Sequence, residues 1–280
     1  MKLVSVAEMR AIEQEADSSG LTYSQMMENA GSGLAQAVLD RIYEEEEQPG
    51  VVGLVGPGNN GGDALVALAH LAAKGWRVRA YLVNRPMEKD LLVERLRAVG
   101  GEITAAKQDE RLEMLSAFIG SATVILDGIL GTGFKLPLKK EFSEVMQAVN
   151  TAIAELEWPP YVVAVDCPSG VNCDTGEAVE EAIPASVTVT MAAVKHGLIK
   201  FPAFELVGDL QVVDIGLSDE IASWIAIRDE VADEKLVEEM LPARPDDSHK
   251  GTFGTALIAA GSVNYTGAAM LAGKSSIAHN

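Results

Sequence analysis

VVGLVGPGNNGGDALV, residues 51–66, decides the fold of this chain. Its apolar half predicts a strand over 51–56, and a helix is expected directly after the turn. The turn holds four glycines within seven residues, which allow a sharp bend and close approach of the backbone to a ligand. It also contains two asparagines and Asp63. A loop that only cradled phosphate would not place a carboxylate there, so the turn predicts a site that handles a cation or a proton beside a nucleotide.

On either side of this turn, continuous Val/Ile/Leu runs alternate with helical stretches. Such runs are typical of strands buried on both faces of a parallel sheet. The order therefore predicts an α/β fold: a three-layer, Rossmann-like sandwich whose sheet is doubly wound and mostly parallel. The expected strands are 51–56, 78–83, 103–106, 123–129, 161–166, 186–191 and 210–215, and the expected helices between them are 61–74, 88–99, 109–119 and 137–156. The link from 186–191 to 210–215 is too short for an ordinary helix, which predicts an antiparallel or irregular piece at that edge.

The N-terminal segment predicts two helices that precede the first strand. Ser5 to Glu8 and Thr22 to Gln25 have the pattern of capping boxes, which open helices over 6–18 and from 22 to about 43. The glutamate run at 44–47 is expected to be a solvated helix end or loop. Small residues over 30–37 permit close packing, and we expect a homodimer.

The bulk composition excludes several classes of function. The 280-residue chain is 48% hydrophobic and carries a net charge of −19, so nucleic acid and anionic membranes would repel it. Two cysteines six residues apart argue against a disulfide framework and favour a reducing compartment. The N-terminus lacks the apolar run of a signal peptide, and no stretch reaches the ~20 apolar residues of a membrane span. We therefore expect a cytoplasmic protein.

The C-terminal part predicts a change of organisation. Residues 217–242 are expected to form a closing helical segment, and 244–248 resemble a linker. Beyond it, a Gly-rich loop, a strand at 256–260, a second Gly-rich turn and the start of a helix are expected. We interpret residues 1–242 as one domain and 243–280 as the incomplete beginning of another.

Polar and glycine-rich residues follow four of the expected strands. In an open parallel sheet the carboxyl ends of the strands form the edge where ligands bind. A buried strand that ends in aspartate is unfavourable unless the carboxylate has a partner or a role. The four sequences are GNNGGD at 58–63, DGILGTGFK at 127–135, DCPSG at 166–170 and KHG at 195–197.

Asn60, Asp127 and Ser169 carry hard oxygen donors on three of these loops. Together with backbone carbonyls they suit an alkali or alkaline-earth cation. Each of them is also a common acceptor for turn amides, so local capping is the alternative interpretation. Because all three fall at one edge of the expected sheet, we favour the cation site.

Asp166 is the candidate general acid or base, and Lys135 is its candidate cationic partner. The alternatives are a turn acceptor for Asp166 and an ordinary surface lysine for Lys135. The 131–133 turn, Gly-Thr-Gly, offers amides and a hydroxyl to phosphate. Cys167 is not expected to act as a nucleophile, because the adjacent carboxylate raises the pKa of a thiol.

The first turn also matches the dinucleotide fingerprint through Gly56, Gly58 and Gly61. Two features argue against a classical dehydrogenase. The second strand ends in Asn84 and Arg85 instead of the acidic residue that would hold a ribose, and Asp63 lies where pyrophosphate should bind. Arg85 meeting a 2′-phosphate remains an alternative.

Five motifs, taken together and in order, resemble the NAD(P)H-hydrate epimerase family, a Rossmann-like domain often fused to a dehydratase. The resemblance extends from about residue 3 to 218. The tail at 249–272, HKGTFGTALIAAGSVNYTGAAMLA, resembles the start of the family's ADP-dependent dehydratase domain. The five motifs are MMENAG at 26–31, GPGNNGGDALVALAHL at 56–71, LDGILGTGFKLPL at 126–138, VAVDCPSGVNCDTGE at 163–177, and TVTM at 188–191 with Lys195 after it.

The resemblance implies an isomerase that interconverts the R and S forms of hydrated NADH and NADPH. It also implies that this chain has no dehydratase activity. A non-catalytic nucleotide-binding or protein-interaction module of the same fold is the alternative. The resemblance assigns Asp166 and Lys135 to catalysis and one potassium ion per subunit to Asn60, Asp127 and Ser169. Ala64 departs from the glycine common in the family. The residues implied to bind substrate are Asn59, Asn60, Gly61, Gly62, Asp63, Gly131, Thr132, Gly133, Phe134, Lys135, Leu136, Pro137 and Asp166.

Overall fold

The structure, a computed structural model, describes residues 1–42, 49–135, 137–241, 245–249, 252 and 257–277. It divides into two compact units, Met1–Val231 and Ala232–Asn280. The glutamate run at 44–47 and Leu136, for which the sequence made predictions, lie outside the described residues.

Within the described residues, the first unit contains a seven-stranded sheet in which all neighbouring strands are parallel. The chain enters the sheet at β2, continues outward to β3 and β4, and then crosses to the other side of β2 to begin β5. The order of winding therefore reverses between β2 and β5, which is where ligands bind in doubly wound sheets. The order across the sheet is β4 (Glu102–Ala105), β3 (Arg77–Leu82), β2 (Gly50–Val55), β5 (Val124–Gly128), β6 (Tyr161–Val165), β7 (Val187–Met191) and β9 (Asp209–Val213).

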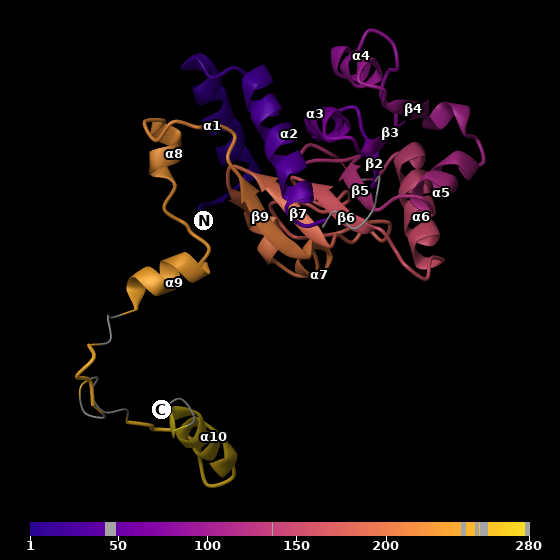
Figure 1. The fold of residues 1–280 in the computed structure, drawn as a ribbon. Helices are drawn as coiled ribbons and strands as arrows, with labels where there is room; N and C mark the ends of the chain where they lie inside the picture. The colour runs from indigo at the N-terminus through magenta and orange to yellow at the C-terminus, as the bar shows by residue number, and fades with distance from the viewer. Residues whose placement is uncertain (43–48, 136, 242–244, 250–251, 253–256, 278–280) are drawn as a thin grey trace. The chain divides into compact units, whose positions relative to one another are not determined.

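Helices cover both faces of this sheet and complete three layers (Figure 1). Alternate residues of the strands point into two separate cores: in β2, Val51 and Val55 join one core and Val52 and Leu54 the other. The three-layer Rossmann-like fold predicted from the sequence is thereby confirmed. One layer contains α1 (Val6–Ser18), α2 (Tyr23–Leu39), α3 (Asn59–Ala73) and α4 (Leu91–Ala98), and the other contains α5 (Glu113–Ile119) and α6 (Lys140–Ala154).

Both predicted capping boxes open their helices. The Ser5 hydroxyl accepts from the Glu8 amide while the Glu8 carboxylate accepts from the Ser5 amide, and Thr22 and Gln25 repeat the arrangement. These reciprocal bonds satisfy two otherwise unpaired amides at each helix start. The second helix ends at Leu39, earlier than the predicted end near 43.

The far edge of the sheet corrects one prediction. β9 pairs with β7 in parallel register, with Val187 opposite Asp209. The prediction of an antiparallel strand at this edge is therefore wrong, and the prediction of an irregular connection is confirmed. The crossover uses β8 (Val194–Lys195), the 3₁₀ helix η2 (His196–Ile199) and α7 (Phe204–Val207) in place of one long helix. β8 also pairs in parallel with β1 (Leu3–Val4), a small sheet that the sequence did not predict.

The remaining elements are short. A 3₁₀ helix, η1 (Ala106–Gln108), precedes α5, and the predicted helical segment at 217–242 contains two separate helices, α8 (Ala222–Ala226) and α9 (Glu234–Met240). In the second unit α10 (Thr266–Ile277) is the helix whose start was predicted, whereas residues 257–260 form no strand. None of the helices in the described residues has the length and apolar character needed to cross a membrane.

Close packing of α2 on α3 depends on Gly31, because a Cβ there would overlap the Val66 side chain. We expect Gly31→Ala to lower the free energy of unfolding by ~1–2 kcal/mol, since overpacking outweighs the better helix propensity of alanine. Urea unfolding measures the change. Ser32→Ala, on the exposed side of the same helix, is the control and should lie within ~0.5 kcal/mol of wild type. Equal stability of the two variants would contradict this packing argument.

Candidate active site

A cavity of about 970 Å³ opens at the carboxyl ends of the central strands. Its walls come from the turn after β2, the loop after β5, Asp166 after β6, Lys195 of β8 and one side of α1. Its size lies at the upper end of the range for small-molecule and cofactor sites. It lies at the switch point of the sheet, on the carboxyl edge of the strands where the sequence predicted ligand binding.

Two glycines give the first turn its shape. A Cβ on Gly56 would overlap the Ile129 carbonyl, and one on Gly61 would overlap the Gly56 carbonyl. The N-cap of α3, Gly58, supplies no side-chain hydrogen bond to the first turn of the helix. The helix therefore presents amide donors and its positive end at the cavity, which is a favourable arrangement for an anion.

Arg85 holds this turn from behind. Its Nη1 donates to the carbonyls of Gly56 and Gly58, at 3.0 and 3.2 Å, and its Nε pairs with Asp90 at 2.8 Å. These bonds make Arg85 a positioning residue for the glycine turn, in contrast to the sequence-based alternative that it meets a 2′-phosphate.

The predicted cation ligands Asn60, Asp127 and Ser169 do come together. Ser169 donates to both carboxylate oxygens of Asp127, from its amide at 2.7 Å and its hydroxyl at 2.6 Å. The backbone amide of Leu130 donates to the Ser169 hydroxyl at 2.9 Å, and the side-chain amide of Asn60 donates to the Leu130 carbonyl at 3.2 Å. The three side chains thus form one buried hydrogen-bonded group, which we call the oxygen cluster.

The oxygen cluster has the chemistry of an alkali-cation site as well as that of a capped turn. It gathers a carboxylate, a hydroxyl and backbone carbonyls beside the side-chain amide of Asn60, and the three side chains are buried. Burial raises the pKa of Asp127 to about 6, although hydrogen bonds from Ser169 and Ile129 oppose the shift. A carboxylate that is hard to ionise without help would gain from an adjacent cation. Among the described residues, no three His, Cys, Asp or Glu side chains form a metal-binding group.

Asp166 is the centre of a second buried network. Its Oδ1 forms an ion pair with Lys195 Nζ and accepts from the Thr190 hydroxyl and the Met191 amide, both at 3.0 Å. Lys195 is only 1% exposed and also donates to the Thr190 hydroxyl and the Met191 carbonyl. Asp166 itself has a φ of 64°, a strained conformation for a non-glycine residue that is often found at functional sites.

The sequence analysis placed Lys195 at the ligand edge of the sheet and in one of the quoted motifs, but it gave this residue no role. The structure gives the ion pair with Asp166 to Lys195, whereas Lys135 is exposed and lines the cavity. A catalytic role for Lys135 stays a prediction. The available signal was a lysine directly after the apolar run MAAV at 191–194, because a buried ammonium needs an anionic partner.

Most of the predicted substrate-binding residues line the cavity. Gly61 and Gly62 instead lie within the first turn of α3, where Gly62 packs against Met27. Their roles in substrate binding stay predictions. The predicted residues that line the cavity are Asn59, Asn60, Asp63, Gly131, Thr132, Gly133, Phe134, Lys135, Pro137 and Asp166.

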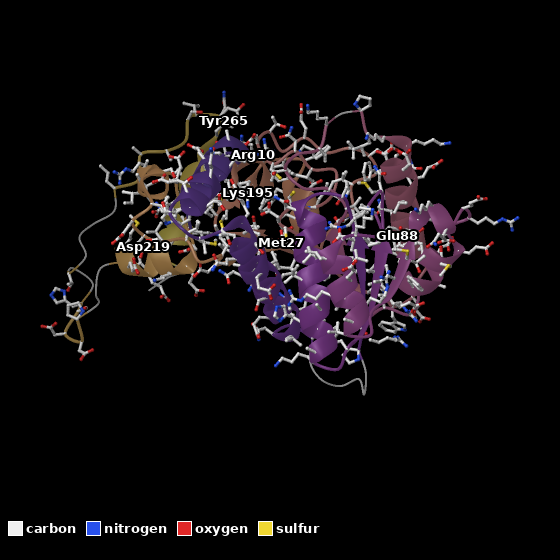
Figure 2. The ribbon with its side chains drawn as sticks, turned by 90° about the horizontal axis from the view of Figure 1, so that it is seen from above. Arg10, Met27, Glu88, Lys195, Asp219 and Tyr265 are labelled. Carbon is white, nitrogen blue, oxygen red and sulfur yellow. The ribbon has the colours of Figure 1, made fainter. Side chains whose placement is uncertain are left out.

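Helix α1 supplies a wall that the sequence reasoning did not include. Arg10 and Glu13 line the cavity together with Lys195 from β8, and Figure 2 labels Arg10 and Lys195. Asp63 is buried among these charged groups. Burial, reinforced by Asp166 and Glu13, raises the pKa of Asp63 well above its ordinary value.

The two cysteines are free and buried. A hydrogen bond with Cys173, then burial, raises the pKa of Cys167 well above its ordinary value. Cys167 is therefore unsuited to nucleophilic chemistry, in agreement with the sequence analysis.

Comparison with known proteins supports one family. Residues 23–197 match the family model of the YjeF-related protein N-terminus. The chain is 35% identical to the bifunctional NAD(P)H-hydrate repair enzyme Nnr of Thermofilum pendens, over 98% of this chain and 51% of that protein. It is 31% identical to the NAD(P)H-hydrate epimerase of Elusimicrobium minutum, over 80% of this chain and 100% of that protein. The crystal structure of yeast ynu0, YNL200c, is similar with a TM-score of 0.61 and 29% identity, covering 70% of this chain and 83% of that one.

The parallel sheet with a cavity at its switch point defines a Rossmann-like α/β protein with a ligand-sized cavity. Within that class, the chain belongs to the YjeF-related protein N-terminus family. It spans about half the length of the bifunctional relatives that it matches.

Proposed function

We propose that this chain is an isomerase that interconverts the R and S forms of hydrated NADH and NADPH at carbon 6 of the nicotinamide ring. The observation that carries the proposal is the buried Asp166–Lys195 pair inside a dinucleotide-sized cavity at the switch point of the sheet. The relatives support it, since they are named as an NAD(P)H-hydrate epimerase and as bifunctional NAD(P)H-hydrate repair enzymes.

The reaction needs proton transfer and no redox step. Carbon 6 of the substrate bears both a nitrogen and a hydroxyl, so it is a carbinolamine. Inversion proceeds by ring opening to an aldehyde or by loss of the hydroxyl to an iminium ion. Each route requires one group to accept a proton and another to deliver one, and positioned groups of this kind contribute ~10²–10⁴-fold each. Asp166 is the acid–base group in this proposal.

The substrate is anionic, whereas the chain carries a net charge of −19. Local cations resolve this conflict, because Arg10, Lys135 and Lys139 line the cavity and the amino end of α3 adds its amide donors. These groups are proposed to hold the pyrophosphate and ribose phosphates.

We further propose that the oxygen cluster of Asn60, Asp127 and Ser169 holds one potassium ion per subunit. The carboxylate, hydroxyl and carbonyl oxygens gathered there support this choice. Bound there, the ion would supply a fixed positive charge next to the glycine turn.

Potassium is expected to stabilise the protein more at pH 7.5 than at pH 5. Without a cation, the folded pKa of Asp127 is about 6 against an ordinary value of 3.8. A raised carboxyl pKa means that Asp127 favours the fold below pH 4 and that ~3 kcal/mol of this contribution is lost as the pH rises through 6. An ion beside the ionised carboxylate restores the loss, so the increase in melting temperature is larger at the higher pH.

Thermal unfolding in potassium chloride and in choline chloride of equal ionic strength measures this effect. Asp127→Asn serves as the reference, because it should remove the Asp127 contribution to the pH dependence together with the response to potassium. Equal melting temperatures in the two salts at both pH values would argue against a potassium site at the cluster.

The proposed reaction is tested by chiral chromatography of one purified epimer of hydrated NADH. We expect the protein to convert either epimer to the same equilibrium mixture much faster than buffer does. If the dinucleotide binds and no interconversion occurs, the chain is a non-catalytic module of the same fold and the isomerase proposal fails.

Two further parts of the proposal concern the rest of the protein. Alignments with the bifunctional relatives cover 97–98% of this chain and so include residues beyond 242. We propose that 1–242 is the epimerase domain and that 243–280 begins an ADP-dependent dehydratase domain. A homodimer and a cytoplasmic location stay predictions, the first of them testable by analytical ultracentrifugation.

A further inference from the structure

One side of helix α1 forms a wall of the cavity. Its lining residues, Val6, Met9, Arg10, Glu13 and Gln14, follow the spacing of three and four that places side chains on one helical face. Three of these side chains are polar or charged. Polar side chains on a helix normally face solvent or a binding site and not the apolar core. Glu13 is half-buried, whereas Arg10 and Gln14 are exposed.

The small β1–β8 sheet fixes this wall in relation to the Asp166 network. Val4 pairs in register with Lys195, and α1 begins two residues later. The Val6 amide donates to Asp174 at 2.8 Å, which ties the helix start to the loop that follows Asp166. The pairing of β1 with β8, the strand that carries Lys195, therefore fixes where α1 lies along the cavity.

Glu13 differs from the other glutamates of α1. Glu8 completes the capping box with Ser5, and Glu15 accepts from Ser223 and the Ala222 amide. Within the described part of the chain, the carboxyl of Glu13 has no hydrogen bond or ion pair, although it lines the cavity. A half-buried carboxyl without a protein partner, facing a ligand-sized cavity, is free to exchange a proton with a ligand.

The surroundings of Glu13 differ from those of Asp166. Burial, together with the negative charge of Asp166, raises the pKa of Glu13, while Lys195 and Arg10 oppose the shift. Asp166 instead forms an ion pair with Lys195. Two carboxyl groups in one site, one held by a buried ammonium and the other without a cationic partner among the described residues, are suited to separate acid and base roles.

Inversion of a carbinolamine carbon requires two groups that exchange protons with the substrate. In the iminium route, one group protonates the leaving hydroxyl, which departs as water when the C6–O bond breaks. Water then adds to the other face of the ring and gives its proton to the second group. In the ring-opening route, one group takes the hydroxyl proton as the C6–N bond breaks, and the other group protonates the ring nitrogen released from carbon 6. In the iminium route the second group gains the proton that the first group gave up, and in the ring-opening route ring closure reverses both transfers, so the protons balance in each.

We infer that Glu13 is a second catalytic residue of this site, which exchanges a proton with the substrate from the α1 wall while Asp166 does so from the strand ends. The inference rests on the proposed function. It assigns a chemical role to a helix that the sequence predicted only as a structural element, and it separates the two acid–base groups onto different walls of one cavity.

The test compares Glu13→Gln, which keeps the shape of the side chain but cannot exchange a proton, with wild type. We expect kcat for interconversion of the hydrated NADH epimers to fall ~10–10²-fold, with KM and the affinity for unhydrated NADPH changed less than twofold. Glu13→Asp should recover part of the lost kcat. Asp17→Asn, which removes one negative charge a turn further along α1 and outside the cavity lining, should keep wild-type kinetics.

Glu13→Ala with added formate provides an independent arm. We expect formate to restore part of the rate, because a small carboxylic acid can occupy the space left by the side chain. A wild-type kcat in Glu13→Gln, or a loss confined to KM, would overturn the role of Glu13 while leaving the epimerase proposal intact. An inactive wild-type protein would overturn both.

Discussion

Replacing Asp166 by asparagine is expected to slow epimer interconversion by ~10²–10⁴-fold, the usual contribution of a positioned acid–base group. Asparagine preserves the shape of the side chain and an oxygen to accept from Thr190 and the Met191 amide, but it cannot take up or deliver a proton. Affinity for the dinucleotide should change little. Chiral chromatography of a purified epimer measures the rate, and titration with NADPH measures the affinity.

A matched control for Asp166→Asn is Asp219→Asn, the same change at an exposed carboxylate away from the cavity (Figure 2 labels Asp219). The control should retain the wild-type rate. Unchanged turnover in Asp166→Asn would remove Asp166 from the mechanism, whereas loss of NADPH binding would assign it to ligand binding.

Replacing Lys195 by methionine is expected to impair both stability and activity. The substitution leaves Asp166 as a buried carboxylate without its cation, and breaking a buried ion pair by removing one partner destabilises by ~3–5 kcal/mol. Loss of the Lys195 ammonium also removes the group that holds the Asp166 carboxylate in place, so the rate should fall as well. Urea unfolding and the epimerisation rate measure the two effects.

A double variant separates these effects. Asp166→Asn combined with Lys195→Met removes both charges, so it should recover much of the stability lost in Lys195→Met and none of the activity. Lys74→Met, at an exposed residue after α3, is the control for loss of a lysine and should be close to wild type. Wild-type stability of Lys195→Met would show that the ion pair with Asp166 does not form in solution.

The elements predicted from local patterns are those that local forces determine. The capping boxes at Ser5 and Thr22 fix helix starts through bonds between neighbouring residues, and continuous apolar runs identify buried parallel strands. The β1–β8 sheet could not be predicted in this way. Its strands have two residues each and lie about 190 positions apart, so nothing in either sequence alone indicates the pairing.

The candidate site shows the same division. Asn60, Asp127 and Ser169 could be placed together because they follow strands whose carboxyl ends share one edge of the sheet. The pairing of Lys195 with Asp166 was not predicted, because Lys195 belongs to the irregular crossover before β9. Glu13 was not predicted as a site residue, because α1 has the pattern of an ordinary amphipathic helix. The pairing of β1 with β8 places the polar side of α1 at the cavity, and the sequence did not predict that pairing.

A crystal structure of the Asp166→Asn variant with hydrated NADH bound tests the central claim most directly. The account predicts the nicotinamide ring inside the cavity, with its carbon 6 hydroxyl within hydrogen-bond distance of residue 166 and the phosphates at the amino end of α3. A dinucleotide bound elsewhere, or one with its ring turned away from residue 166, would contradict it.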